Sequence, residues 1–562
     1  MDRNTLLAFF LIALVLIFTP YYIETVSPPP PVLPEELEKE ESVTGSDESF
    51  FLEEKPAAER VQKIKNEEIY QQSQIRIGSA QERTIDVETD LFTALVSSNG
   101  GGFLKSFMFK GFYDEDSQMV DLINGTNQEN LSLAITDLDG DQLDLGGAWR
   151  YDGYFTGGKI KDETTLVFYV EISPGEKITK SLTFYPDKYI VDIDINVADV
   201  SDRVFAGVYS LFWNGGLSPT EKNEKDDLVY FYSYVFQGGE LVDLKVKGGE
   251  SESKTFNGST DWVAVRTKYF IACLLPEDPT LVSSAGIVGN HDDHEYYDVS
   301  LSLPAAEPTR VSLYLGPLEY ERIKGVGKEL DRVMNFGWGP VKPLSRGVLW
   351  LLKKMHDYIP NYGVVLILFS ILIKIIVFPL TKKSYQSTAA MQTIQPEIND
   401  LKEKHKNNPK KLNQATMKLY KDRGVNPLGG CLPMLLQMPL LFALFVVFRT
   451  TIELRGEPFV LWITDLSAPD VVFSLPFSIP IYGSHVAVLP MLMVVSMFIQ
   501  QRMMGGGAAQ QAQQKIMQYF MTGFFFLIFN TFPSGLNLYY TLFNVLTIAQ
   551  QKLIPPAEHQ SQ

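Results

Sequence analysis

Residues 362–380 read YGVVLILFSILIKIIVFPL, an apolar run that only Ser370 and Lys374 interrupt. About 20 apolar residues are enough to cross the hydrocarbon core of a bilayer as a helix. The pattern therefore predicts a membrane-spanning helix, which we assign to residues 361–381. Lys374 is the unusual residue of this helix, because a charge deep in a bilayer is costly unless it faces water or a partner.

Further apolar runs occur on both sides of this helix. They predict transmembrane helices at residues 431–451, 481–502, 515–532 and 534–553. Near the N-terminus, an apolar run from Leu6 to Phe18 is followed by aromatic residues, which predicts an uncleaved signal anchor over residues 1–23. A signal peptide removed after about Tyr22 is the alternative. The predicted fold class is thus a polytopic α-helical membrane bundle with six transmembrane helices.

The segment between the second and third predicted helices, residues 382–425, is rich in positive charge. From Lys382 to Gly430 the chain has ten Lys or Arg and four Asp or Glu. Because such loops stay in the cytoplasm, both termini are predicted to be inside. Residues 382–405 and 410–423 are typical of helices. We expect a cytoplasmic basic helical hairpin, in which Ile394, Ile398 and Leu401 pack against Leu412, Ala415 and Leu419.

Charge divides the 562-residue chain into two parts. Residues 341–562 contain 20 basic and 10 acidic side chains, whereas the first 340 residues contain 29 and 57. The acidic part argues against nucleic-acid binding, which needs a basic face. With the termini inside, this acidic part is predicted to lie outside, in the periplasm of a bacterium.

The acidic part is predicted to begin with a linker and to continue as an all-β domain. Residues 24–58 include four consecutive prolines and many acidic residues, which predicts a disordered spacer. Residues 59–335 contain many short segments of period two, which predicts a large antiparallel β-sandwich. Residues 338–360 predict an amphipathic helix in the membrane interface, with an ordinary surface helix as the alternative. Residues 554–562 are predicted to form a short cytoplasmic tail.

Polar residues of the last predicted helix give a second signal. Asn537, Thr541, Asn544 and Gln551 recur on one helix face, with Tyr540 beside them. Together with Ser370 and Lys374, they suggest a hydrophilic cavity that offers a cation to an anionic guest. Hydrogen bonding between helices explains the stripe equally well, and a lysine that only reaches to the interface is the alternative for Lys374.

No sequence motif indicates catalysis or a bound cofactor. The two cysteines, Cys273 and Cys431, lie in different parts of the chain and outside any CxxC motif, so each is expected to be a buried small hydrophobic residue. The sequence has no GxSxG, no paired-histidine metal motif and no nucleotide-binding P-loop. We therefore predict no enzyme activity, no metal site and no cofactor.

Three stretches resemble the YidC-type membrane protein insertases. They are VFPLTKKSYQSTAAMQTIQPEI at residues 377–398, YKDRGVNPLGGCLPMLLQMPLLFALF at residues 420–445 and FPSGLNLYYTLFNVLTIAQQ at residues 532–551. The resemblance is close from about Trp338 to Leu553 and extends to the rest of the chain by layout. It is to the form with a large periplasmic domain, whose fold is a β-supersandwich similar to sugar-binding domains.

This resemblance implies a function. The chain would insert, fold and help to assemble integral membrane proteins in the bacterial inner membrane, alone or with the Sec translocon and without ATP hydrolysis. Five of the six helices would form a core around a hydrophilic groove that is open to the cytoplasm and to lipid. Lys374 stands where the family usually has Arg, and Lys keeps the charge but not the planar fork. The implied groove residues are Lys374, Ser370, Tyr540, Asn537, Thr541 and Asn544.

The resemblance also implies partners. Nascent membrane proteins would contact Met434, Gln437 and Met438 on the third helix. The basic hairpin would capture clients early and could contact the ribosome through Lys402, Lys404, Lys410, Lys411 and Lys418. The Sec translocon, accessory Sec components and membrane lipids complete the set, with no nucleic-acid site.

Two other classes of function stay open on the residues alone. One is a secondary transporter or channel for a small anion, with Lys374 as the binding cation, although no internal repeat is visible. The other is a membrane scaffold whose β domain senses a periplasmic ligand, which leaves Lys374 and the basic hairpin unexplained.

Overall fold

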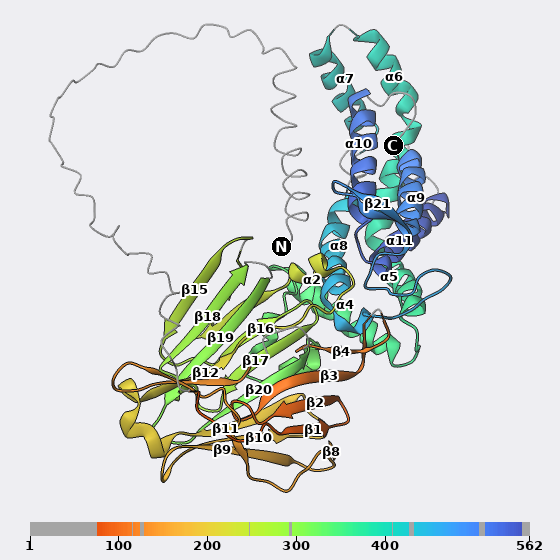
Figure 1. The fold of residues 1–562 in the computed structure, drawn as a ribbon. Helices are drawn as coiled ribbons and strands as arrows, with labels where there is room; N and C mark the ends of the chain where they lie inside the picture. The colour runs from red at the N-terminus through yellow and green to blue at the C-terminus, as the bar shows by residue number, and fades with distance from the viewer. Residues whose placement is uncertain are drawn as a thin grey trace, which may run out of the picture. The chain divides into compact units, whose positions relative to one another are not determined.

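The computed structural model describes residues 76–553 except residues 115, 124–128, 247, 292–294, 407, 426–431 and 505–511. The predicted anchor (1–23), linker (24–58), first residues of the β domain (59–75) and tail (554–562) lie outside this described part. So does Cys431. Within the described part, strands dominate as far as Pro317 and helices follow (Figure 1).

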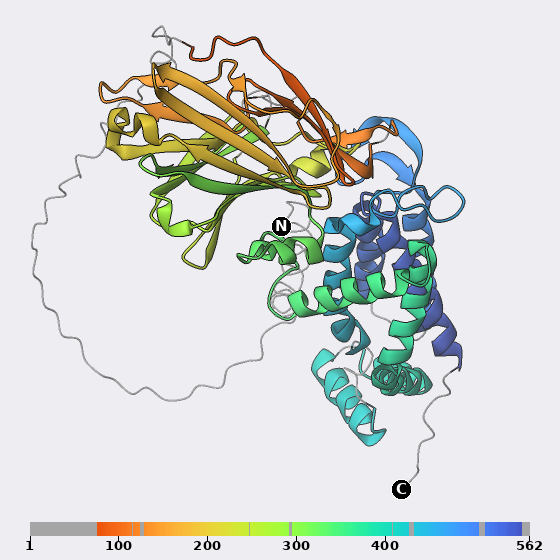
Figure 2. The same ribbon diagram turned by 90° about the horizontal axis from the view of Figure 1, so that it is seen from below.

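Three sheets form the β domain (Figure 2). A five-stranded sheet has the order β4 (Met119–Asp121), β3 (Phe103–Tyr113), β2 (Phe92–Ser97), β1 (Thr84–Glu88), β8 (Gly158–Lys159). A nine-stranded sheet has the order β14 (Glu240–Leu244), β13 (Tyr232–Gln237), β16 (Trp262–Arg266), β17 (Phe270–Pro276), β20 (Thr309–Pro317), β11 (Ile190–Asn196), β10 (Glu176–Phe184), β9 (Thr164–Ser173), β7 (Arg150–Tyr151). A six-stranded sheet has the order β15 (Ser251–Asn257), β18 (Ser284–His291), β19 (Glu295–Pro304), β12 (Val208–Trp213), β5 (Ser132–Thr136), β6 (Gln142–Asp144). The predicted all-β region is therefore present, and its strands pair antiparallel except for β1 with β8.

The period-two pattern of the sequence explains how these strands bury one face. In β11 the sequence IVDIDIN alternates, so Val191, Ile193 and Ile195 are fully buried while the residues between them are half-buried. The central strand β17 is buried along its whole length, and it contains Cys273, which is fully buried as expected.

A fully buried cation lies inside this apolar core. Lys180 of β10 is fully buried and donates hydrogen bonds to the carbonyl oxygens of Gly100, at 3.1 Å, and Leu131, at 2.6 Å. Burial lowers the pKa of Lys180 to about 7. Its ammonium group is thus held by backbone dipoles rather than by a described carboxylate.

The helical part follows the β domain in sequence. Its helices are α3 (Tyr320–Val326), α4 (Val341–His356), α5 (Tyr362–Thr393), α6 (Gln395–Lys404), α7 (Pro409–Asp422), α8 (Leu432–Thr450), α9 (Val488–Met504), α10 (Ala512–Phe529) and α11 (Ser534–Leu553), while the short α2 (Glu224–Leu228) lies within the β domain. Among the described residues, Tyr362–Pro379 of α5 is the one stretch long and apolar enough to span a bilayer. Parts of α8, α9 and α10 are apolar but shorter. The count of six spans therefore stays a prediction.

The predicted helix boundary at Lys382 is wrong. Helix α5 continues through Pro379 and the basic residues to Thr393, so the predicted segments 361–381 and 382–425 share one continuous helix. The basic residues that follow Leu380 do not interrupt the backbone hydrogen bonding of the helix. The break comes at Ile394, because Pro396 has no N–H group to donate to the carbonyl oxygen four residues earlier and its ring clashes with that carbonyl.

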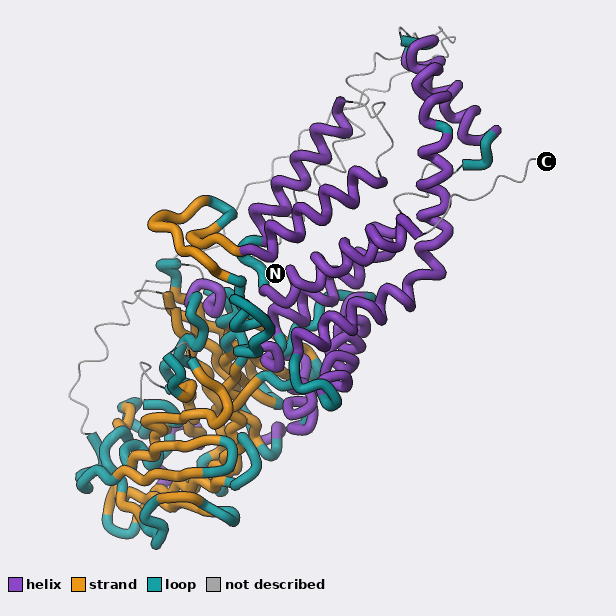
Figure 3. The backbone as a smooth tube through the Cα atoms, turned by 90° about the vertical axis from the view of Figure 1, so that its right-hand side faces the viewer, coloured by secondary structure: helices purple, strands orange, loops and turns teal. Residues whose placement is uncertain are grey.

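The predicted start of a helix at residue 481 is also wrong. Residues 471–487 form a β-hairpin of β21 (Val471–Ile479) and β22 (Gly483–Ala487), drawn in orange beside the helices in Figure 3. Helix α9 begins only at Val488. The Asp470 carboxylate accepts hydrogen bonds from the backbone N–H groups of Val488, at 3.0 Å, and Leu489, at 2.8 Å, and so caps the helix from a distance in sequence.

Helices α6 and α7 form the predicted helical hairpin. Arg423 and Glu397 join them in an ion pair of 2.6 Å. A small apolar core contains Ile394, Ile398 and Leu419 as predicted, together with Ala390, Tyr420 and Val425. The other predicted members, Leu401, Leu412 and Ala415, are half-buried outside this core.

Helix α4 covers most of the segment predicted as an interfacial helix. It packs against α8 and is held by ion pairs from Lys353 to Glu319, at 3.1 Å, and Glu453, at 3.0 Å. Trp350 of the same helix is exposed. These contacts fix one face of α4 on the protein, and the other face stays free for the membrane interface that the sequence predicts.

The burial of Lys180 predicts a pH-dependent stability. The folded state loses this proton near pH 7 while the unfolded chain keeps it to about pH 10, so the stability of the wild type rises with pH in that window, by at most about 1.4 kcal/mol per pH unit. In Lys180→Met this contribution is absent. We expect the thermal midpoint of the wild type, minus that of Lys180→Met, to increase from pH 7 to pH 9 in detergent. The exposed Lys161→Met is the control, and a constant difference for Lys180→Met contradicts the assignment.

Candidate functional site

Lys374 lies where helices α5 and α11 meet. Its side chain is buried, with a residue exposure of 5%. The ammonium group donates a hydrogen bond to the hydroxyl of Thr547 and lies 3.6 Å from the centre of the Phe543 ring, both on α11. A hydroxyl oxygen and the electron-rich face of an aromatic ring both stabilise a cation, but neither neutralises it. The described contacts of Lys374 include no carboxylate.

The other predicted residue of α5, Ser370, is fully buried one turn before Lys374. Its hydroxyl donates to the carbonyl oxygen of Leu366, at 2.7 Å, within the same helix. This bond satisfies the donor of the hydroxyl in its apolar surroundings. The lone pairs of the Ser370 oxygen remain as hydrogen-bond acceptors on this face of α5.

The polar stripe of α11 is present, and its members do different things. Asn544 donates to the hydroxyl of Ser496 on α9, at 3.2 Å. Asn537 donates to the carbonyl oxygens of Phe529, at 3.0 Å, and Phe532, and so closes the turn that precedes α11. Thr541 donates to the carbonyl oxygen of Asn537 in its own helix. Hydrogen bonding between helices therefore accounts for Asn544, whereas the bond to Lys374 comes from Thr547.

Thr547 is the residue that the sequence analysis missed. It lies three residues after Asn544 and four before Gln551, and so completes the helical spacing of the stripe. That spacing was the available signal. Threonine was overlooked because its hydroxyl is common in apolar helices, where it bonds to the preceding turn, as Thr547 also does with Phe543.

Several polar atoms of α11 are buried without a hydrogen-bond partner among the described residues. They are the hydroxyls of Tyr539 and Tyr540, Oδ1 of Asn537, Oε1 of Gln550 and the side-chain amide of Gln551. The ring of Tyr540 packs edge-on against Phe529 and Tyr539, each with centroids 5.6 Å apart. Buried polar groups of native proteins are usually paired, so these groups have the capacity to bind a polar guest.

The residues predicted on α8 do not appear among the described contacts of Lys374. Gln437 and Met438 are half-buried, and the side chain of Met434 lies outside the described part of the structure. The described contacts of the Lys374 ammonium group come from α11, not from α8.

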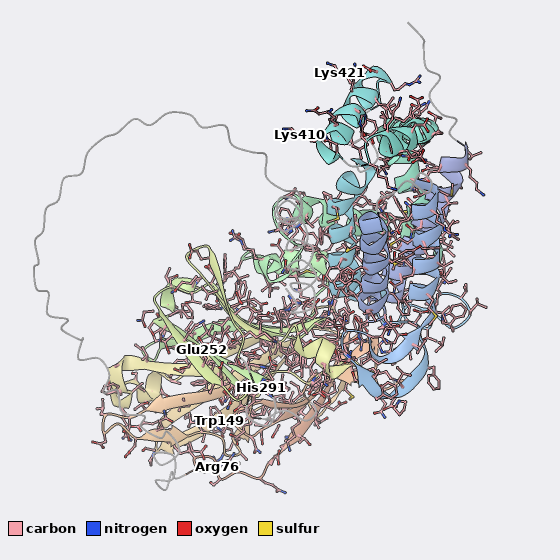
Figure 4. The ribbon with its side chains drawn as sticks, turned by 90° about the horizontal axis from the view of Figure 1, so that it is seen from above. Arg76, Trp149, Glu252, His291, Lys410 and Lys421 are labelled. Carbon is pink, nitrogen blue, oxygen red and sulfur yellow. The ribbon has the colours of Figure 1, made fainter. Side chains whose placement is uncertain are left out.

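The predicted lysines of the basic hairpin lie mainly at its surface. Lys404, Lys410, Lys411 and Lys418 are exposed, while Lys402 is half-buried. Figure 4 shows Lys410 and Lys421 on the outside of this hairpin. The arrangement leaves several positive charges available to an anionic partner.

An ion-pair network at the other end of α8 was not predicted. Arg449 pairs with Asp226 of α2 at 2.7 Å, and Asp226 also pairs with the buried Lys268 at 2.7 Å. Burial alone would raise the pKa of Asp226, but the two cations outweigh it and lower that pKa to about 2. A second ion pair joins Arg455 and Glu221 at 2.7 Å. These bonds connect the helical part to the β domain.

Two family models and the named relatives of this chain indicate the same family. Models for the family described as 60Kd inner membrane protein and for the YidC periplasmic domain match residues 354–560 and 84–351. The chain is 35% identical over 568 residues to the membrane protein insertase YidC of Chloroherpeton thalassium, with 98% of this chain and 95% of that protein covered. It is 37% identical over 490 residues to the protein of the same name from Chlorobium luteolum, with 84% and 82% covered. A crystal structure of an active YidC insertase aligns at 18% identity over 85% of this chain and 94% of that chain, with a TM-score of 0.36.

The contact between Lys374 and Thr547 predicts an energetic coupling. A hydrogen bond to a buried charged group contributes about 1.5–3 kcal/mol, so Thr547→Val should lower the thermal midpoint in detergent. In a Lys374→Met background the same substitution should have little effect, because the charge is gone. Thr541→Val is the matched control, since its hydroxyl bonds only within α11. Additive effects of Thr547→Val and Lys374→Met would show that the two side chains do not interact in solution.

Proposed function

The chain belongs to the YidC family of membrane protein insertases of the bacterial inner membrane, and we propose that it inserts client segments at the polar face that α5 and α11 share around Lys374. The observation that carries this proposal is the buried ammonium group of Lys374, whose contacts among the described residues include no carboxylate. A family function alone does not say which residues act, and this group is the feature of the bundle that a client could use.

The proposed first step is electrostatic. The acidic flank of a client is attracted to Lys374. A carboxylate of this flank takes the place of the Thr547 hydroxyl as the hydrogen-bond acceptor of the ammonium group, and it binds more strongly because it is charged. The polar atoms of Asn537, Tyr540 and Gln551 that lack described partners offer further hydrogen bonds to the same polar segment. The client flank thus enters the protein without losing all of its polar contacts, which lowers the barrier to crossing.

The proposed second step is apolar. Helix α5 exposes Val364, Leu368, Ile371 and Ile375, which recur at helical spacing along one face. A client helix that moves along this face, beside Gln437 and Met438 of α8, can pass into lipid. Burial of apolar surface contributes about 25 cal/mol per Å², so the membrane segment of the client supplies the driving force and ATP is not required.

The proposed topology follows the distribution of charge. The basic hairpin of α6 and α7 and both termini lie in the cytoplasm, with six crossings in all, and the acidic β domain lies in the periplasm. On that side the β domain is available to Sec components. The exposed Lys404, Lys410, Lys411 and Lys418 are available on the cytoplasmic side to clients, to anionic lipids and to the ribosome.

The electrostatic step predicts a charge requirement at residue 374. Lys374→Glu should abolish insertion of clients with acidic flanks, because it replaces attraction by repulsion, whereas Lys374→Arg should stay close to the wild type. Insertion of a short two-span client is measured by protease protection in vesicles that contain equal amounts of each variant. Lys552→Glu, at the exposed end of α11, controls for the change in net charge. Equal insertion by Lys374→Glu and the wild type would refute the proposed step.

Photo-crosslinking tests where the client binds. Probes at Lys374, Ser370, Met434 and Tyr540 should crosslink to the nascent client, while a probe at the exposed Tyr154 of the β domain should not. If the bundle probes fail in a chain that is folded and inserted, the same cation is better explained as the site of a transporter or channel for a small anion.

A further inference from the structure

The hairpin of β21 and β22 has no evident role in the bundle. No Asp, Glu, Lys or Arg occurs between Asp470 and Arg502, a stretch that contains the whole hairpin and most of α9. The ionisable side chains of the hairpin are those of Tyr482 and His485. A surface loop in water normally carries charge, so this composition calls for a different surrounding.

The apolar side chains of the hairpin point away from the protein. Phe473 and Phe477 are each 60% exposed, and Val471, Val472 and Ile481 are also exposed. Since Val471 and Val472 are neighbours in one strand, both faces of the strand present apolar surface. An exposed apolar surface of this kind marks a site of interaction.

The base of the hairpin is firmly attached. Asn530, after α10, is fully buried and donates to the carbonyl oxygens of Tyr482, at 2.9 Å, and His485, at 2.7 Å, while its own side-chain oxygen accepts from the N–H of Ala487. Asp470 accepts from the indole N–H of Trp462, at 2.9 Å, and from the first N–H groups of α9. The apolar part is therefore held in one position relative to the start of α9.

The exposed surface continues onto α9. Met491, Leu492, Val495 and Ile499 form an exposed apolar stripe along that helix. In a protein of the inner membrane, such an outward apolar stripe faces lipid. The hairpin extends this surface without an intervening charge. We therefore expect lipid to cover the hairpin as well as the stripe on α9.

We propose that the β21–β22 hairpin lies in the outer leaflet, at the boundary between headgroups and acyl chains, with Phe473 and Phe477 in the lipid. Its outer strand edges have unpaired backbone groups, which cannot be satisfied in the hydrocarbon core but can be in the headgroup region. Its aromatic and serine residues suit that region too. A client chain or a second copy of the protein is the alternative occupant that the test below distinguishes.

The test uses an environment-sensitive fluorophore (NBD) on single cysteines, in full-length protein with Cys273 and Cys431 replaced by Ala. Proteoliposomes contain lipids with a spin label near the headgroup or deep in the acyl chain. Phe477→Cys and, independently, Phe473→Cys are the reporters. Val495→Cys on α9 is the control for lipid exposure, and Tyr154→Cys in the β domain is the control for water.

We expect blue-shifted emission at both hairpin positions, with a greater loss of fluorescence from the shallow label than from the deep one. Emission like that of Tyr154→Cys, without quenching by lipid, would overturn the proposal. Blue-shifted emission that lipid labels do not quench, but that a spin-labelled second copy or client does, would also overturn it. The proposal rests on α9 being in the membrane, so loss of quenching at Val495→Cys would reject that placement, whereas loss at the hairpin alone rejects only the hairpin.

Discussion

The ammonium group of Lys374 constrains how the helices of this protein can pack. A charge in an apolar helix must find water or a partner, and the described partners of Lys374 come from one turn of α11, where Thr547 and Phe543 lie. Helix α11 is therefore fixed against α5 by a contact that compensates the charge only in part. The proposed function depends on this incomplete compensation, because a lysine already paired with a carboxylate would attract an acidic client flank only weakly.

The remaining polar groups of the bundle can be understood from the same constraint. Asn544 bonds across to Ser496 of α9, and Asn537 closes the turn before α11, so both hold α11 in the position that Lys374 requires. At the end of the helical part next to the β domain, Arg449 and Arg455 form ion pairs with Asp226 and Glu221. Among the described residues of the helical part, Arg449 and Arg455 are thus paired at the end next to the β domain, whereas Lys374 lies buried within the bundle.

The sequence predicted the fold well where a pattern is local. Period-two strands, the apolar run around Lys374 and the helical hairpin all follow from neighbouring residues. Lys374 was singled out as a charge within that run, and Ser370 and Asn544 by helical spacing. It failed where the deciding partner is distant. Asp226 lies 223 residues from Arg449, so the network that joins them has no local signal. Thr547 was missed although its spacing was visible, because a hydroxyl in an apolar helix usually bonds to its own backbone.

The error at residue 481 has a physical lesson of its own. The segment 481–502 was assigned as a helix because its apolar residues sum to the length of a membrane span. Helix α9 has 17 residues, about 26 Å at 1.5 Å per residue, which is less than the roughly 30 Å of a hydrocarbon core. The apolar stretch of sequence is therefore longer than the helix, and its remaining residues belong to the β-hairpin of residues 471–487. With Asp470 and Asn530 fixing the junction, the hairpin covers apolar thickness that α9 does not reach, and this compensation explains why an uncharged hairpin with two exposed faces can be stable at this end of the bundle.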